Sequence, residues 1–222
     1  MTDVSALTIA ILGGTGGQGQ GLAFRFANAG LKVIIGSRDA ERAQASAAEL
    51  AAKVTAGQVT GASNASASVA ADVIVVAVPW EAHEKTLSAL VTELAGKIVI
   101  DCVNPMGFDE RGPYRLTTDD GSAAEEAARI LPESTVVAAF HHVSAVLLSD
   151  PAVTSLDLDV LVLGDDRAAT DTVQALAELM PGVRGIFGGR LRNAGQVESL
   201  TANLIAINRR YKTHAGIRIT GL

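Results

Sequence analysis

Residues 9–19 of this chain read IAILGGTGGQG. An apolar strand that leads into G-x-G-x-x-G, here Gly14, Gly16 and Gly19, is typical of the loop that holds the pyrophosphate of a dinucleotide. The three glycines allow a tight turn, close approach of a phosphate to the backbone, and close contact between helix and strand. A helix that begins near Gly19 would direct its free N–H groups at that phosphate. The stretch predicts a nucleotide-binding loop, and a glycine-rich turn with a purely structural role is the alternative.

Apolar runs rich in Val and Ile recur along the chain and alternate with helix-like segments. Because the clear runs lack polar alternation, they are typical of parallel strands that are covered on both faces. This alternation predicts an α/β fold, a doubly wound Rossmann-type parallel sheet. The expected strands are Leu7–Leu12, Lys32–Gly36, Val73–Ala77, Ile98–Asp101, Thr135–Ala139, Val160–Leu163 and Val183–Ile186, with Gln58–Gly61 as a weak eighth.

Helices are expected between these strands. They are Gly21–Ala29, Ala40–Lys53 after the N-cap Asp39, Glu81–Leu94, a helix that begins at Ser122 with Glu125 in a capping box, and Arg167–Leu179.

The end of the chain differs from the rest. From Asn193 to Arg210, apolar residues follow helical spacing with no clear strand after them. We therefore expect a nucleotide-binding domain over residues 1–188 and a small helical segment over residues 189–222. The stretch Cys102–Gly121 is expected to be a long polar loop, and Ala62–Ala71 a connector.

The composition excludes several classes of protein. A net charge of −6 over 222 residues argues against nucleic acid as the main partner. The single cysteine rules out an internal disulfide, and the four histidines lack metal-ligand spacing, so we expect no metal. The longest strongly apolar run, Val73–Val78, is far short of the roughly 18–20 residues that span a membrane. Met1–Leu7 lacks the basic region of a signal peptide, so we expect a cytoplasmic protein.

The charge is unevenly distributed. Residues 186–222 carry six lysines and arginines against Glu198 alone, a balance of +5, although the whole chain is acidic. A basic segment on an acidic body is typical of an anion-binding or subunit-docking face. A helix with a solvated basic side is the alternative.

The residues after the second predicted strand indicate which dinucleotide binds. An NAD site would have a carboxylate there, whereas this chain has Ser37 and Arg38, with Arg42 one helical turn further on. A hydroxyl and two guanidinium groups suit the 2′-phosphate of NADP(H). The alternative is a surface arginine pair bound to Asp39 and Glu41.

Unusual residues also follow three other predicted strands, where ligands of open α/β sheets bind. They are Val78-Pro79-Trp80, Asn104-Pro105-Met106 and Phe140-His141-His142. We expect them to form one crevice, although each has a structural alternative as a strand terminator, a turn residue or a core histidine. No Ser/His/Asp, Cys/His or paired-carboxylate set is evident, so hydrolysis has no support.

Four runs resemble the NADPH-dependent F420 reductases, also called 8-hydroxy-5-deazaflavin:NADP oxidoreductases. They are ILGGTGGQGQGLAFRFANAG (11–30), VIIGSRDAERA (33–43), VIVVAVPWEAH (73–83) and QVESLTANLIAINRRY (196–211). The resemblance covers nearly the whole chain, and its opening is shared with the reductase domain of ferric-reductase membrane proteins. It implies reversible hydride transfer between NADP(H) and the deazaflavin coenzyme F420, and a homodimer.

The resemblance also implies residue roles. No residue would act as a chemical catalyst, because the protein only positions two hydride carriers, and the deazaflavin would contact Asn193 and one of the two histidines, His141 or His142. The basic segment at residues 186–222 would receive the acidic tail of the deazaflavin, and replacing Arg190 and Arg192 by Ala should weaken binding of this coenzyme. The expected NADP contacts are Gly14, Thr15, Gly16, Gly17, Gln18, Gly19, Ser37, Arg38, Arg42, Val78, Pro79, Asn104 and Ala139.

Two rival functions remain at this level. One is an NADPH-dependent reductase of another small acceptor, such as a flavin, a ferric chelate or an imine acid. The other is a non-catalytic NADP(H)-sensing protein that binds a partner protein.

Overall fold

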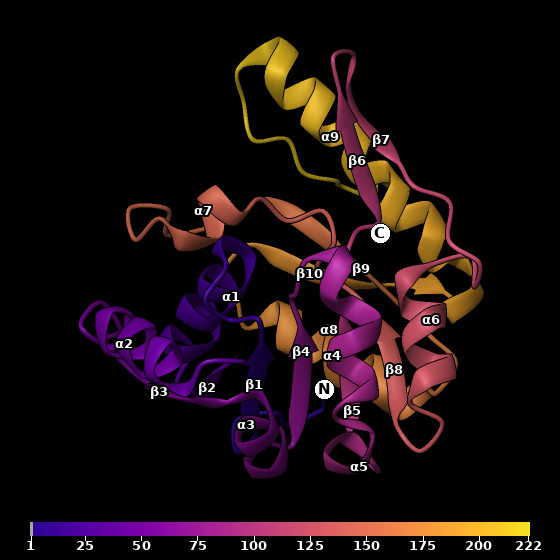
Figure 1. Cartoon of the computed structure of the whole chain (residues 1–222). Coiled ribbons are helices and arrows are strands. Elements are labelled where there is room, and N and C mark those ends of the chain that lie inside the picture. The colour runs from indigo at the N-terminus through magenta and orange to yellow at the C-terminus, as the bar shows by residue number, and fades with distance from the viewer. Residues whose placement is uncertain (1) are drawn as a thin grey trace.

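The computed structural model describes residues 2–222. An eight-stranded sheet lies at its centre with helices on both faces (Figure 1), which confirms the predicted doubly wound architecture and its weak eighth strand. The strands lie in the order β10-β9-β8-β5-β4-β1-β2-β3. Their bounds are β1 Thr8–Leu12, β2 Lys32–Ser37, β3 Gln58–Ser63, β4 Val73–Val76, β5 Ile98–Asp101, β8 Thr135–Ala138, β9 Leu158–Gly164 and β10 Val183–Gly189.

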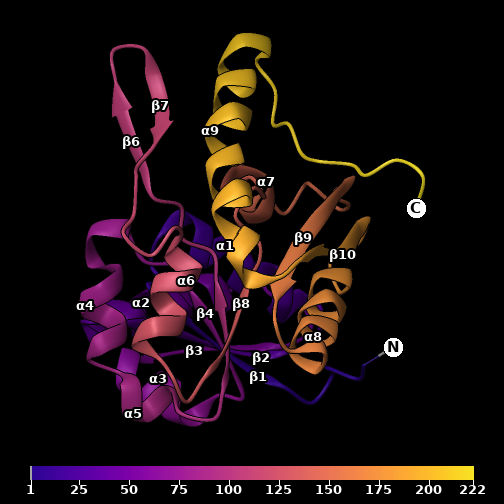
Figure 2. The same ribbon diagram turned by 90° about the vertical axis from the view of Figure 1, so that its right-hand side faces the viewer.

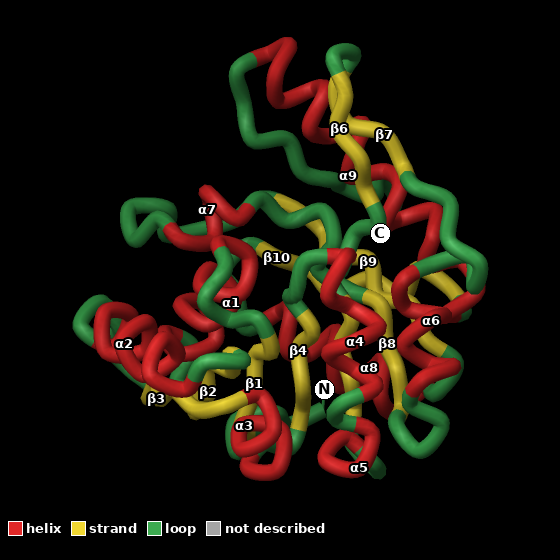
Figure 3. Tube along the Cα trace, viewed as in Figure 1, coloured by secondary structure: helices red, strands yellow, loops and turns green. Residues whose placement is uncertain are grey.

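Two apolar cores lie on the two faces of the sheet. In β1, Ile9 and Ile11 belong to one core, and Ala10 and Leu12 to the other, because successive side chains of a strand point to opposite faces. Figure 3 shows helices on both sides of the strands. The first core is covered by α1 Gly17–Asn28, α2 Ala40–Ala51 and α8 Arg167–Glu178, and the second by α3 Asn64–Ala70, α4 His83–Ser88, α5 Val91–Leu94 and α6 Ala123–Ile130.

The last two strands of the sheet correct the expectation of an all-parallel arrangement. β9 pairs with β8 in antiparallel fashion, and β10 pairs in parallel with β9, so both run against the other six strands. The connection after β8 contains the short helix α7 Ala145–Ser149, which packs on α1 and does not cross back over the sheet. No crossover returns the chain to the end of the sheet at which the parallel strands begin. β9 therefore starts where β8 ends and runs antiparallel to it.

Two segments expected to lack regular structure are ordered. The stretch predicted as a polar loop contains an antiparallel hairpin of β6 Met106–Asp109 and β7 Gly112–Arg115. The Asp109 carboxylate accepts the N–H groups of Arg111 and Gly112, and Gly112 has a φ of 119°. An Asp and a Gly flanking two residues is a turn signature that the prediction missed.

The expected connector at residues 62–71 holds the helix α3, whose N-cap Ser63 accepts the N–H of Ser66. The helix predicted at Glu81–Leu94 is broken into the 3-10 turn η1 Trp80–Ala82, α4 and α5. The predicted caps of Asp39 and Ser122 are confirmed by hydrogen bonds to the first turns of α2 and α6.

An arm extends from the body of the molecule. It consists of the β6–β7 hairpin and the outer part of α9 Ala194–Tyr211, which follows the 3-10 turn η2 Leu191–Asn193 (Figure 2). The inner end of α9 is anchored, because Ala194 and Val197 belong to the second core. After α9 the chain returns to the sheet, where the carbonyl of Ile217 accepts the N–H of Asp159 in β9. Within residues 2–222, no helix combines the length and apolar character needed to cross a membrane.

Candidate active site

Two adjoining cavities lie at the carboxyl ends of the parallel strands. The loop cavity, of about 370 Å³, lies over the glycine-rich turn, and the helix cavity, of about 360 Å³, lies between the strand ends and α9. They form one crevice because four residues line both of them. The shared residues are Gln18, Ala77, Val78 and Pro79.

The glycines of the loop divide into two groups. A Cβ on Gly14 would lie 2.8 Å from the carbonyl of Ile11, and one on Gly19 would lie 2.6 Å from the Cα of Gly14, so the packing of α1 on β1 requires both. A Cβ on Gly16 or Gly17 would come no closer than 3.5 Å to the protein. Since the fold does not require these two glycines, their small size serves the crevice, where the N-terminus of α1 can accept a phosphate.

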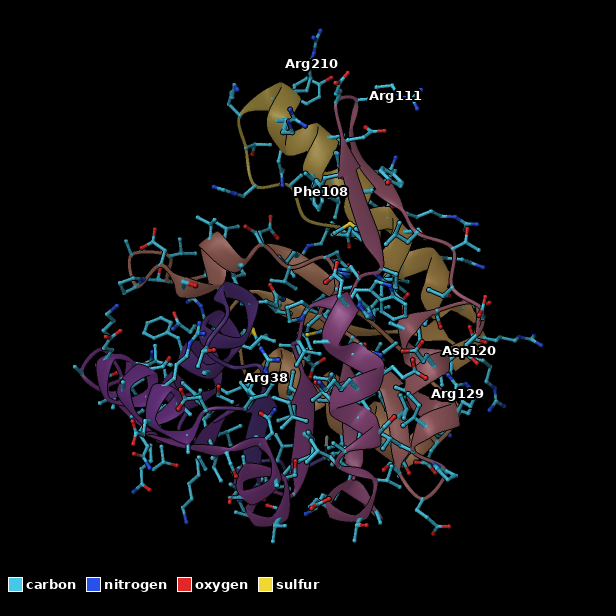
Figure 4. The ribbon with its side chains drawn as sticks, in the orientation of Figure 1. Arg38, Phe108, Arg111, Asp120, Arg129 and Arg210 are labelled. Atoms are coloured by element: carbon cyan, nitrogen blue, oxygen red, sulfur yellow. The ribbon has the colours of Figure 1, made fainter. Side chains whose placement is uncertain are left out.

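Ser37, Arg38 and Arg42 line the outer side of the loop cavity together with Thr15 and Asn64. Figure 4 shows Arg38 between the N-terminal helices and α4. The Asp39 carboxylate caps α2, and none of the ion pairs among the described residues involves Arg38 or Arg42. The two guanidinium groups are therefore free to bind an anion, which disfavours the surface-pair alternative.

A third cavity of about 360 Å³ extends the crevice between α3 and α4. It shares Ser37, Arg38 and Asn64 with the loop cavity. The Oδ1 atom of Asn64 is buried without a hydrogen-bond partner, which leaves it available to a ligand. Asn64 was not predicted from the sequence, although its position after the third strand is where ligand contacts occur.

The strand ends of the helix cavity are held by side-chain to backbone hydrogen bonds. Gln18 Nε2 donates to the carbonyl of Phe140 at 3.1 Å, and Asn104 Nδ2 donates to the carbonyl of His141 at 2.9 Å. Phe140 has a φ of 64°, an unfavourable conformation for a bulky residue. This backbone turn directs His141 and His142 to the cavity lining, so local strain coincides with the site.

Both histidines of the cavity are neutral. Burial lowers the pKa of His141 to about 4 and that of His142 to about 4. Neither ring nitrogen of His141 has a hydrogen-bond partner in the protein, and Nδ1 of His142 also lacks one. Buried polar atoms without partners are rare in folded proteins, so these nitrogens are suited to a polar ligand in the cavity.

Some predicted residues do not line the crevice. Gly14 and Gly19 lie beneath the loop, and Ala139 is fully buried behind the cavity wall. Asn193 lies at the start of α9 outside both cavities, with its amide nitrogen against Gly189. Arg190 donates to the carbonyl of Asp165 at 3.0 Å and lines a separate cavity beside α8.

Other lining residues were missed. On α9, the residues Thr201, Leu204, Ile205 and Asn208 face the helix cavity. Their spacing of three and four places them on one helical face, a signal that was present in the sequence. Ala215 of the returning C-terminal segment lines the same cavity, and nothing in its local sequence indicates this. No group of three or more metal-binding side chains occurs in the part of the chain that the structure describes.

Comparison with known proteins relates this crevice to a family. The chain is 43% identical to the F420-dependent NADP reductase of Methanothermobacter thermautotrophicus, over 100% of this chain and 98% of that protein. It is 39% identical to the enzyme of the same name from Methanocaldococcus jannaschii, over 97% and 99% of the two chains. The chain belongs to the F420-dependent NADP reductase family. The model of the family described as NADP oxidoreductase, coenzyme F420-dependent, matches residues 8–105, which hold the glycine loop and the Ser37–Arg42 segment.

One solved structure agrees with this family membership, and a second shares only the fold. A crystal structure of a candidate F420-dependent NADP reductase from Arthrobacter sp. FB24 superposes with a TM-score of 0.81 at 28% identity, over 97% of this chain and 100% of that chain. A reductive aminase from Aspergillus terreus shares the fold alone, with a TM-score of 0.64 at 17% identity, over 93% of this chain and 63% of that one.

Proposed function

We propose that this chain catalyses reversible hydride transfer between NADP(H) and the deazaflavin coenzyme F420. The observation that carries the proposal is one continuous crevice with free arginines at one end and, at the other, two neutral histidines that keep three ring nitrogens without a partner in the protein. The chain is 43% and 39% identical to two F420-dependent NADP reductases over nearly its full length, and this similarity indicates F420 as the second substrate. Nicotinamide C4 and deazaflavin C5 supply the hydride chemistry when both coenzymes are bound.

The first role of the protein is to bind the dinucleotide. In this proposal, the backbone N–H groups of Gly16, Gly17 and the N-terminus of α1 donate hydrogen bonds to the pyrophosphate. Side chains at these two glycines would occupy the crevice. Ser37, Arg38 and Arg42 bind the 2′-phosphate through charge-assisted hydrogen bonds. Val78 and Pro79, which line both cavities, form the passage toward the nicotinamide end.

The second role is to hold two rings face to face without water between them. The helix cavity is lined by apolar Leu204 and Ile205 of α9 as well as by His141 and His142. Neutral His141 can donate one ring N–H and accept at the other nitrogen, so it can orient a polar ring edge without adding charge. Holding reacting carbons roughly 3–3.5 Å apart supplies much of the rate acceleration in such a transfer.

The test is to mix the protein with NADPH and oxidised F420 and follow the visible absorbance of the deazaflavin. Loss of that absorbance is the expected result. Turnover with a flavin, a ferric chelate or an imine acid but not with F420 would instead favour another reductase. NADPH binding without turnover of any acceptor would favour a sensor.

The nucleotide end has its own test, the variant Arg38→Ala. Loss of a hydrogen-bonded charge at the 2′-phosphate should raise the KM for NADPH by at least about tenfold. The KM for NADH should stay within about twofold of the wild-type value. Steady-state kinetics with both nucleotides measure the difference. Equal effects on the two would remove the 2′-phosphate from this corner of the crevice.

We also infer that the enzyme is a homodimer that acts in the cytoplasm, with residues 189–222 as a helical segment at the interface. The outer arm exposes large apolar side chains, which in a monomer would lie in water (Figure 4 labels Phe108). They are Phe108, Tyr114, Ile207 and Tyr211. Phe108→Asp should convert the dimer to a monomer in light scattering, and an unchanged mass would remove the hairpin from the interface.

A further inference from the structure

The motif VPWEAH contains a histidine that the site described above does not use. His83, the last residue of the motif, begins α4 and is completely buried. Its Nε2 lies 2.7 Å from Oδ2 of Asp101, and its Nδ1 lies 2.7 Å from Oε1 of Glu126. A histidine bound by a carboxylate at each nitrogen fits the doubly protonated ring, which is a donor at both.

The charge of this ring follows from its partners. Burial alone would lower the pKa of His83, but the attraction and hydrogen bond of Asp101, together with those of Glu126, raise it to about 9. Other ionisable groups interact with this cluster: Cys102 and His141 with Asp101, Arg129 with Glu126, and Glu198 of α9 with Asp101 and His83. Burial raises the pKa of Glu198 to about 8. The cluster therefore keeps a positive His83 between two carboxylates at neutral pH.

One side of the His83 cluster reaches the helix cavity, the nicotinamide end of the crevice. The ring of His83 lies against Trp80, with centroids 5.5 Å apart, and Trp80 lines the helix cavity beside Pro79. Asp101 is the last residue of β5, and its Oδ1 accepts the N–H of Val103, another lining residue, at 3.0 Å. The contact between His83 and Asp101 thus links two neighbouring parts of one wall.

The other side of the cluster, at Glu126, is connected to the α9 wall of the crevice. Glu126 belongs to α6, and the first two N–H groups of α6, those of Ala123 and Ala124, donate to the Glu198 carboxyl at 3.0 and 3.2 Å. Glu198 is 3% exposed and lies in α9, one turn before Thr201, where the lining face of α9 begins. The first turn of α6 therefore joins two sets of polar contacts, one from His83 of α4 to Glu126 and one from the α6 N-terminus to Glu198 of α9.

We propose that His83 is a positioning residue for hydride transfer, which holds the Pro79–Trp80 wall and the α9 wall of the crevice at a fixed separation. The inference rests on the proposed function, because the two walls would bracket the two stacked rings. A shift of the walls would lengthen the donor–acceptor distance without removing any contact to either coenzyme. A displacement of about 1 Å in such a site can cost on the order of 100-fold in rate.

The test compares His83→Gln and Glu126→Gln with the control Arg129→Gln. Arg129 also lies on α6 and has Glu126 and Glu84 nearby, but it is half-exposed and its hydrogen bonds go to Asp120 at the surface (Figure 4). Single-turnover reduction of F420 is followed in stopped flow with NADPH and with NADPH deuterated at both C4 positions. Thermal melts record folding, and fluorescence titration gives the NADPH Kd.

The expected result is a slower chemical step in a folded protein. His83→Gln can bond only one of the two carboxylates at a time, so its single-turnover rate should fall at least about tenfold. Its deuterium isotope effect should become more temperature-dependent, with the NADPH Kd within about twofold of wild type. Glu126→Gln should give an intermediate rate, and Arg129→Gln the wild-type rate.

The pH profile distinguishes positioning from general damage. The wild-type rate should fall as the pH rises through about 9, where His83 loses its proton, and His83→Gln should lack that fall. An unchanged rate in folded His83→Gln overturns the proposal, as does a loss that Arg129→Gln reproduces. If His83→Gln does not fold, a wild-type isotope effect and rate in Glu126→Gln overturns it. Wild-type protein that never reduces F420 would contradict the proposed function instead.

Discussion

Two histidine sites in this fold have opposite charge states although both are buried. His83, His141 and His142 are 0%, 3% and 4% exposed. His83 has a carboxylate 2.7 Å from each ring nitrogen and a pKa raised to about 9, whereas the crevice pair has pKa values lowered to about 4. The carboxylates beside a buried histidine ring, and not how deeply the ring is buried, therefore decide whether it is charged. The ring of His83 belongs to the scaffold, whereas both nitrogens of His141 and Nδ1 of His142 remain available to a ligand.

The largest expected effect concerns stability. His83→Leu leaves Asp101 fully buried without its cation, which should lower the free energy of unfolding by roughly 3–5 kcal/mol. His141→Leu removes no hydrogen bond within the protein and should cost less than about 1 kcal/mol. Urea denaturation of both variants measures the contrast, and equal losses would abolish the distinction between the two sites.

The pH dependence of stability should differ in sign between the sites. The folded pKa of each crevice histidine lies below its value in the unfolded chain, so its stabilising contribution is present above pH 6.5 and is lost as the pH falls through about 4. A shift of this size corresponds to roughly 3 kcal/mol per residue. For His83 the folded pKa is raised, so its contribution is complete below pH 6.5 and is lost as the pH rises through about 9.

Urea midpoints between pH 4 and 9.5 measure this contrast. The double variant His141→Gln/His142→Gln should flatten only the acid side of the curve of urea midpoint against pH. His83→Gln should flatten only the alkaline side of that curve. Glu198, whose pKa is raised from 4.5 to about 8, adds a loss of stability as the pH rises from about 4.5 through 8, and this loss is common to wild type and both variants. A double variant that leaves the acid side unchanged would show that the crevice pair is solvated and not buried neutral.

A smaller effect is expected on coenzyme affinity. The proposed hydrogen bond of His141 to the deazaflavin would be worth about 1–1.5 kcal/mol, so His141→Ala should raise the KM for F420 about tenfold and leave the KM for NADPH nearly unaffected. Steady-state kinetics would separate this pattern from that of His83→Gln, which should lower kcat. An unaltered KM for F420 would assign His141 to the scaffold as well.

The smallest effect is expected at Arg190. The sequence suggested that the basic segment containing Arg190 receives the acidic coenzyme tail, but the Arg190 side chain is bound to Asp165 and lines a cavity beside α8. Arg190→Ala should therefore leave the KM for F420 within about twofold of wild type. A strong rise would indicate that the tail reaches across the edge of the sheet to β10.

Local sequence determined the nucleotide half of the molecule. The Gly14-x-Gly16-x-x-Gly19 loop, the helix caps of Asp39 and Ser122 and all eight predicted strands were recognisable because each depends on neighbouring residues. The position of Ser37 and Arg38 on the crevice followed from the rule that ligands bind at strand ends. The hairpin at residues 106–115 also had a local signal, its Asp-Glu-Arg-Gly turn, which was overlooked.

Only the tertiary structure decided the other half. The reversed direction of β9 depends on where α7 packs, and the far wall of the crevice depends on where α9 and Ala215 return to the sheet. The His83 bridge joins residues that are 18 and 43 positions apart, and Glu198 meets α6 over 75 positions. Such pairs carry no periodic or local pattern, because their geometry arises only when distant elements pack together.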